Sequence, residues 1–343
     1  MGNSPIRVLA FVSEILSAKT LVPIINALRS DPEFCVRIIN DGFCAEFVRS
    51  LALPVEYIVE DFESRIDVEV RSTSVVLMGK SYVQPSEYSI LRRAAHWGVP
   101  VLLVVPDMGL DVVRAKLKGI GVSIPWPKLL LADHRTRESL GELRVPADRV
   151  VEFGNPYFDD LYAELRGDDP GCWDPVGIGY FSTPFELDFK RGILPADYRH
   201  RDFVDDIRRV CFKLGQPLQV KRHPQVDPDL FDGLTVFDGT PLQMIRKIRV
   251  AVGSYSTTLL EAYVAGIPTI SYQPWEANIR EDVFACRIPI VKTPADFEAL
   301  LRVALLHTTS TEGPNLITYN PGRSLEAIQS LLKELALAKA NAV

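Results

Sequence analysis

The residues with the clearest chemical potential lie in the run from Gly253 to Ile270, GSYSTTLLEAYVAGIPTI. An apolar stretch precedes Gly253, and serines and threonines follow it at four positions: Ser254, Ser256, Thr257 and Thr258. A helix that begins after a strand presents unpaired backbone N–H groups and the positive end of its dipole, which suits a phosphate. Serine and threonine are also ordinary N-caps, which explains one of these hydroxyls but not all four. The pattern predicts an anion-binding loop.

A second group of polar residues follows an expected strand at Leu218–Lys221. Lys221, Arg222 and His223 stand at its carboxyl end, before Pro224. Cationic groups at that place can bind a phosphate through charge-assisted hydrogen bonds. The alternative is that the lysine and arginine are solvated and that His223 caps a turn.

Further binding candidates lie close to these two segments. Ser182 and Thr183 follow an expected strand at Ile178–Phe181. Glu261 lies in the helix after the hydroxyl-rich loop, where a carboxylate can accept two ribose hydroxyls; alternatively, the helix dipole stabilises its charge. Trp275 follows another expected strand and either stacks on a ligand or packs in the core.

The elements that must position these side chains alternate between strands and helices. Continuous apolar runs such as Ile6–Val12 and Val101–Val105 indicate buried parallel strands, and Thr20–Leu28 has the apolar spacing of a helix. This alternation predicts α/β domains with parallel sheets covered on both faces. We expect two Rossmann-like domains that face an interdomain cleft. The expected bounds are 1–160 for an acceptor domain, 161–177 for a linker, 178–322 for a nucleotide-donor domain and 323–343 for a closing helix that packs back toward the first domain.

Composition excludes several classes of protein. With 343 residues, 47% hydrophobic and 24% charged, the chain is typical of a soluble protein of two domains. Its formal charge of −6 argues against a nucleic-acid partner. The five cysteines are scattered without metal-ligand spacing, which predicts no metal site and favours a reducing cytoplasm. No apolar run is long enough to cross a membrane.

The second half of the chain resembles the nucleotide-binding domain of GT-B glycosyltransferases and of UDP-N-acetylglucosamine 2-epimerase, which shares that fold. The resemblance rests on the hydroxyl-rich run with Glu261 and Gly266-Ile267-Pro268, on Lys221–Pro224, on Phe153–Asp159, and on the closing helix after Asn320–Arg323. Within this group, a His-Pro motif followed by a serine/threonine motif is most similar to bacterial surface-glycan transferases.

The resemblance implies roles for particular residues. His223 would contact the donor phosphate, and Ser254, Ser256 and Thr257 would bind the phosphate or the nucleoside. It also implies metal-independent transfer without a cofactor, from a nucleotide-activated sugar to a glycan or lipid-linked acceptor. Fixed donors would stabilise the negative charge that develops on the leaving nucleotide.

A catalytic base is expected in the first domain if the transfer inverts, because an inverting transfer needs a carboxylate that takes the proton of the attacking hydroxyl, whereas a retaining transfer needs no such base. Asp107 follows the strand at Val101–Val105, and Glu14 follows the first strand. Each of these carboxylates is also well placed to cap the next helix.

Three functions remain open at this point. The first is a glycosyltransferase or related transferase, the second is an epimerase or hydrolase acting on the nucleotide-sugar alone, and the third is a catalytically inert nucleotide-binding protein. The sequence leaves open peripheral contact with the inner face of a membrane and a homodimer.

Overall fold

The computed structural model divides the chain into two compact units. The first comprises Met1–Asp160 and Leu316–Val343, and the second comprises Leu161–Asn315. The structure describes the residues in these ranges: 4–13, 15–42, 45–58, 60–79, 85–105, 117, 120–121, 124–131, 140–167, 175–190, 199–275, 288–306 and 324–342. No helix within these ranges is long and apolar enough to cross a membrane.

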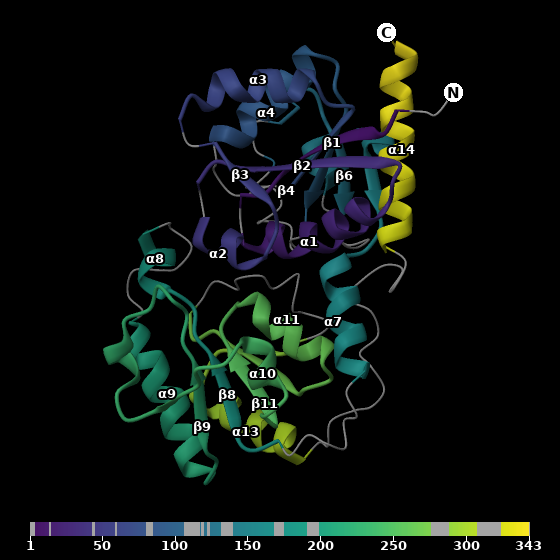
Figure 1. The fold of residues 1–343 in the computed structure, drawn as a ribbon. Coiled ribbons are helices and arrows are strands. Elements are labelled where there is room, and N and C mark those ends of the chain that lie inside the picture. The colour runs from purple at the N-terminus through teal and green to yellow at the C-terminus, as the bar shows by residue number, and fades with distance from the viewer. Residues whose placement is uncertain are drawn as a thin grey trace. The chain divides into compact units, whose positions relative to one another are not determined.

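The first unit is built on a seven-stranded sheet in the order β3-β2-β1-β4-β5-β6-β7. Figure 1 shows helices on both sides of its strands. Every neighbouring pair of strands runs parallel. The strands are β1 (Ile6–Phe11), β2 (Phe34–Asn40), β3 (Val55–Tyr57), β4 (Val75–Gly79), β5 (Val101–Val105), β6 (Lys128–Leu131) and β7 (Val150–Glu152). Its helices are α1 (Ile15–Ser30), α2 (Ala45–Ser50), α3 (Phe62–Arg71), α4 (Pro85–His96) and α14 (Ser324–Ala342). Short 3-10 turns occupy Leu140–Leu143 and Ala147–Arg149, and α7 (Pro156–Gly167) contains the boundary between the units.

Helices cover both faces of this sheet, as the continuous apolar strands require. Leu9 and Phe11 of β1 join a core cluster that includes residues of α3 and α4. Val8 and Ala10 belong to the opposite cluster, with residues of α1 and α14. Because successive strand residues point to opposite faces, both sets are buried. Helix α14 thus completes the core of the first unit.

The second unit contains a six-stranded parallel sheet in the order β10-β9-β8-β11-β12-β13. Its strands are β8 (Ile178–Phe181), β9 (Leu218–Lys221), β10 (Thr235–Val236), β11 (Val250–Gly253), β12 (Thr269–Tyr272) and β13 (Ile290–Val291). Its helices are α8 (Phe185–Lys190), α9 (His200–Lys213), the 3-10 helix η4 (Pro228–Phe231), α10 (Pro241–Ile245), α11 (Thr257–Val264) and α13 (Pro294–Leu306).

Consecutive residues of β8 show how this second sheet is covered. The Tyr180 ring lies 5.6 Å from the Phe203 ring of α9. A side chain at Gly179 would instead meet Met244, which lies in α10, and Ile248, which follows that helix. Neighbouring strand residues face opposite ways, so α9 and α10 lie on opposite faces of the sheet.

The α/β class with parallel sheets is confirmed, whereas several expected bounds differ. The apolar residues Val36–Ile39 predict a strand, and the observed strand is longer (Phe34–Asn40). The residues Ile288–Val291 predict another strand, and the observed one is shorter (Ile290–Val291). The sequence also indicates a helix that starts near Thr136, and the first residues of that helix lie outside the described ranges. These differences arise because strand ends depend on pairing with a neighbour, which a single segment does not encode.

The order of strands reverses once in each sheet. In the first unit β1 lies between β2 and β4, and in the second β8 lies between β9 and β11. Open parallel sheets bind ligands outside the carboxyl ends of the strands at such a reversal. Ligand sites are therefore expected at the β1/β4 edge and at the β8/β11 edge.

Candidate functional site

The hydroxyl-rich loop begins where β11 passes close to β8. A Cβ atom on Gly253 would lie 3.0 Å from the backbone oxygen of Phe181, so the bare glycine allows this close approach. The next residue, Ser254, is buried, and its Oγ lies 2.9 Å from Oγ1 of Thr183. This pair joins the loops that follow the two strands of the reversal.

A second set of bonds fixes the backbone of this loop. Ser271, in the adjacent strand β12, donates its hydroxyl to the carbonyl oxygen of Ser254. Gln273 donates to the hydroxyl of Ser271 at 2.9 Å. The loop is therefore held from the β8 side and from the β12 side.

Helix α11 begins directly after the loop. Ser256 is its N-cap and accepts the N–H of Thr258 at 3.2 Å, so capping does explain one of the four hydroxyls. Thr257 and Thr258 form the first turn and are half-buried. At the other end, Gly266 has a φ of 76° and lets the chain turn into β12, which sets the length of α11.

The basic segment lies beside the same edge. Ser182 donates its N–H to the carbonyl of Lys221 at 3.1 Å, and its Oγ accepts the N–H of His223 at 2.7 Å. The Nδ1 atom of His223 accepts the N–H of Gln225 at 3.2 Å, as the turn-capping alternative predicts. A neutral imidazole that accepts at Nδ1 carries its proton on Nε2, so His223 is also a hydrogen-bond donor.

The two cations of this segment have backbone partners. Lys221 donates from Nζ to the carbonyl of Phe237 at 3.3 Å, and Arg222 donates from Nη1 to the carbonyl of Val226 at 2.9 Å. Both residues are half-buried. Their charges stay at the carboxyl end of β9, while their side chains also hold the neighbouring loops.

Two other sequence candidates are buried within the second unit. Glu261 lies in the second turn of α11 with 3% of its surface exposed. Since the helix dipole acts mainly within the first turn, it contributes little to this carboxylate. Trp275 packs edge-on against Phe185, with ring centres 5.7 Å apart, which favours core packing over stacking on a ligand.

The β1/β4 edge of the first unit has a different chemistry. The carboxylates predicted as catalytic bases, Asp107 and Glu14, lie outside the described residues. Ser13 follows β1 by two residues and donates its hydroxyl to Oε1 of Glu87 at 2.8 Å, and Glu87 is fully buried at the start of α4. Sequence reasoning missed Glu87, although a carboxylate in the first turn of a helix was the available signal.

The described parts of the chain show no metal centre, and the thiol of Cys211 is buried. No group of three or more His, Cys, Asp or Glu side chains there is arranged to hold a metal ion. Burial raises the pKa of the Cys211 thiol to about 12, so this cysteine stays protonated at neutral pH.

Comparison with known proteins identifies solved structures that have a similar fold. No protein-family model matches the sequence, and no curated protein matches it. Among solved structures, the UDP-GlcNAc 2-epimerase of Methanocaldococcus jannaschii in complex with UDP-GlcNAc and UDP has a TM-score of 0.67 at 13% identity, over 96% of this chain and 100% of its own. The UDP-GlcNAc 2-epimerase of Neisseria meningitidis, bound to UDP-GlcNAc, has a TM-score of 0.68 at 14% identity, over 96% and 100%.

A transferase has the same kind of fold. The glycotransferase of kitacinnamycin has a TM-score of 0.55 at 13% identity, over 98% of this chain and 96% of its own. The chain therefore has a GT-B-like fold of two Rossmann-like units, as predicted.

Proposed function

We propose that this protein is an enzyme that binds a nucleotide-activated sugar at the β8/β11 edge of its second unit. The observation that carries the proposal is two hydrogen-bonded pairs at the point where the strand order reverses, Thr183 with Ser254 and Ser182 with His223. Ser254 lies shortly before the start of α11. Hydroxyls and helix N–H groups are the donors that a diphosphate requires.

The chemistry of this edge suits a leaving nucleotide. Negative charge develops on the nucleotide as its bond to the sugar breaks, and donors that are already fixed in place stabilise it without reorganisation. The N–H at Nε2 of His223 and the first N–H groups of α11 are such donors. Lys221 and Arg222 add positive charge nearby, and Glu261 is the proposed contact to the ribose hydroxyls.

For the reaction, we propose transfer of the sugar to a glycan or lipid-linked acceptor without a metal. The support is the similarity of Lys221–Pro224 and of the hydroxyl loop to surface-glycan transferases. In this proposal Asp107 takes the acceptor proton, with Glu14 as the other candidate.

A second candidate function is a nucleotide-sugar 2-epimerase or hydrolase. It is favoured by the likeness of the whole chain to UDP-GlcNAc 2-epimerases. This reaction needs no acceptor, so it can be separated from transfer by experiment.

The test has a binding part and a reaction part. Isothermal titration with UDP, CDP, CMP and GDP identifies the nucleotide, and a protein that binds none of them contradicts the proposal. The protein is then incubated with UDP-GlcNAc, without an acceptor, and followed by ¹H NMR. A new 2-epimer or released sugar supports the epimerase or hydrolase, whereas an unchanged but bound substrate supports transfer or an inert binding protein. Turnover on addition of a glycan acceptor then separates those two.

A further inference from the structure

Three aromatic side chains come from the loops that follow β8, β11 and β12. Phe185 lies two residues after Thr183, at the start of α8. Tyr255 directly follows Ser254 in the hydroxyl-rich loop, and Trp275 follows β12. All three aromatic side chains are buried. Because each ring belongs to a different loop, contacts between the rings can hold these loops at fixed distances from one another.

The three rings contact one another directly. The Phe185 ring stacks on the Tyr255 ring, with centres 6.3 Å apart and planes inclined by 13°. Trp275 stands edge-on to both, with its ring centre 5.7 Å from that of Phe185 and 6.1 Å from that of Tyr255. Offset stacking and edge-on contact are the arrangements that aromatic pairs prefer. We call Phe185, Tyr255 and Trp275 the aromatic cluster.

The aromatic cluster joins the same two loops as the hydroxyl pair of the proposed nucleotide site. The N–H of Phe185 donates to the carbonyl of Thr183 at 2.9 Å, and Tyr255 is the chain neighbour of Ser254. The hydroxyl oxygens of Thr183 and Ser254 lie 2.9 Å apart. A phosphate that accepts from both hydroxyls replaces the bond between them, whereas it leaves the ring stack intact. The stack can therefore keep the two hydroxyls in place once the ligand is bound.

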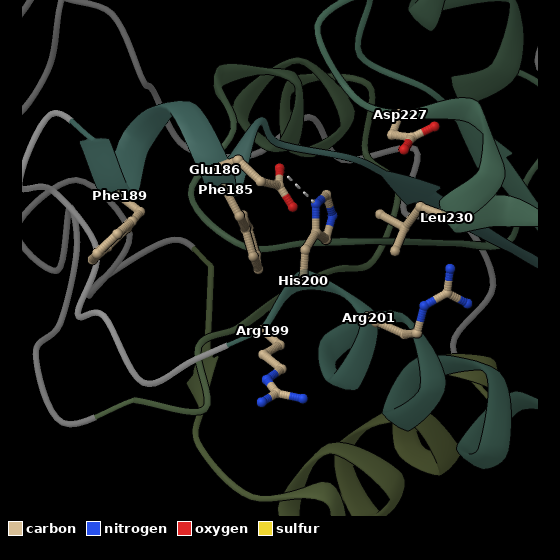
Figure 2. Close-up of a pocket in the computed structure, with 8 residues that line it drawn as sticks. All are labelled: Phe185, Glu186, Phe189, Arg199, His200, Arg201, Asp227 and Leu230. Carbon is tan, nitrogen blue, oxygen red and sulfur yellow. Dashed lines mark ion pairs between the residues drawn. The ribbon is translucent and has the colours of Figure 1, made fainter.

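A further ring supports Phe185 beside a cavity. His200 stacks on Phe185 with ring centres 4.3 Å apart, and its Nε2 lies 3.1 Å from the hydroxyl of Tyr180. Figure 2 shows Phe185 and His200 next to each other in the lining of this cavity, whose volume is about 370 Å³. A cavity supplies no packed atoms on its side of a ring. The place of Phe185 therefore depends on its contacts with the neighbouring rings.

We propose that Phe185 and Tyr255 are positioning residues of the proposed nucleotide site, whose stacked rings hold Thr183 and Ser254 at the spacing that a diphosphate requires. This inference rests on the proposed function and names two residues that act through others, since the hydroxyls and not the rings contact the phosphate. Donors that are already in place bind a ligand without the cost of ordering them. Loss of the stack should therefore weaken nucleotide binding.

Isothermal titration of the full chain with UDP, CDP, CMP and GDP tests the proposal. The key variant is Phe185→Leu, and Phe297→Leu is its matched control, because Phe297 is also buried and stacks on Tyr272 with ring centres 5.1 Å apart. Each variant loses one buried ring, so both should lose thermal stability. We expect the Kd of the tightest-binding nucleotide to rise at least about tenfold in Phe185→Leu and to stay within about twofold in Phe297→Leu.

Tyr255 provides a second pair of variants, which keeps the test valid if Phe185→Leu is poorly folded. Tyr255→Phe keeps the ring and should retain the affinity, whereas Tyr255→Leu removes the stack and should raise the Kd at least about tenfold. An equal Kd in Phe185→Leu and Phe297→Leu, or an equal loss in Tyr255→Phe and Tyr255→Leu, would overturn the proposal and leave the nucleotide site itself standing. An unmodified protein that binds none of the four nucleotides would instead contradict the proposed function, and this inference with it.

Discussion

The β1/β4 edge and the β8/β11 edge have the same topology and opposite chemistry. In each, the order of strands reverses beside the first strand, and the second strand of the reversal ends in a glycine, Gly79 or Gly253. The β1/β4 edge buries an acceptor, the carboxylate of Glu87, with Ser13 donating to it. The β8/β11 edge buries two hydroxyls that bond to each other, Thr183 and Ser254.

This difference gives the same backbone arrangement a different binding chemistry at each edge. Hydroxyls and the N–H groups of α11 are donors, and donors suit a phosphate. A buried carboxylate repels a phosphate and suits groups that donate a hydrogen bond or a proton. The second unit is therefore the side of the protein on which we expect the nucleotide.

The largest expected effect comes from the glycines themselves. A Cβ on Gly79 would lie 2.3 Å from Cβ of Ser17, whereas a Cβ on Gly253 would lie 3.0 Å from the Phe181 oxygen. We expect Gly79→Ala to destabilise the protein by about 3 kcal/mol and Gly253→Ala by about 1 kcal/mol, because the first clash is more severe. Thermal unfolding followed by circular dichroism measures both. A larger loss in Gly253→Ala would show that the two edges are packed differently from this account.

The next effect concerns the buried carboxylate. Glu87→Ala leaves the Ser13 hydroxyl without its acceptor, which should cost about 1–3 kcal/mol of stability. UDP affinity should stay the same, because the change lies in the first unit. The double variant with Ser13→Ala should recover part of the loss. Denaturant unfolding measures the stability, and a Glu87→Ala protein as stable as the original would contradict the role of this bond.

Matched serines at the two edges test the comparison directly. Ser254→Ala removes a hydroxyl from the proposed phosphate site and should raise the Kd for UDP about tenfold, equivalent to about 1.4 kcal/mol. Ser13→Ala makes the same chemical change at the β1/β4 edge and should leave that Kd unchanged. Isothermal titration calorimetry on both variants measures the two Kd values for UDP. An equal loss of UDP affinity in both variants, or a loss only in Ser13→Ala, would contradict a nucleotide site confined to the β8/β11 edge.

The smallest effect is a pH dependence confined to the second unit. Burial lowers the pKa of His200, so the unfolded chain binds a proton before the folded one does as the pH falls below about 6.5. Stability should therefore be highest above that pH and fall below it, with a slope of at most about 1.4 kcal/mol per pH unit for this group. His200→Gln should reduce the slope. Unfolding curves between pH 5 and pH 8 measure it, and an identical slope in the variant would remove His200 as the cause.

Much of this fold follows from the sequence, because buried parallel strands are continuous apolar runs. Val101–Val105 shows this directly, since all five residues are buried and the strand has the expected bounds. The start of α11 was likewise predictable, since a serine before a helix is a local capping signal, and Ser256 fulfils it.

The site was harder to predict, because its contacts are not local. Thr183 and Ser254 lie 71 residues apart, and only the pairing of β8 with β11 brings them together. The backbone partners of Lys221 and Arg222 depend in the same way on how the loops pack. The burial of His200 was also hidden, because an Arg-His-Arg sequence alone indicates an exposed basic segment.

Hydrogen–deuterium exchange with and without saturating UDP tests the central claim most directly, because it reports on both edges in one experiment. The account predicts slower exchange at residues 253–260, with smaller protection at residues 182–183 and 222–223, and no change at residues 11–13. Protection at 11–13 without protection at 253–260 would contradict it, and so would unchanged exchange at both edges with each of UDP, CDP, CMP and GDP.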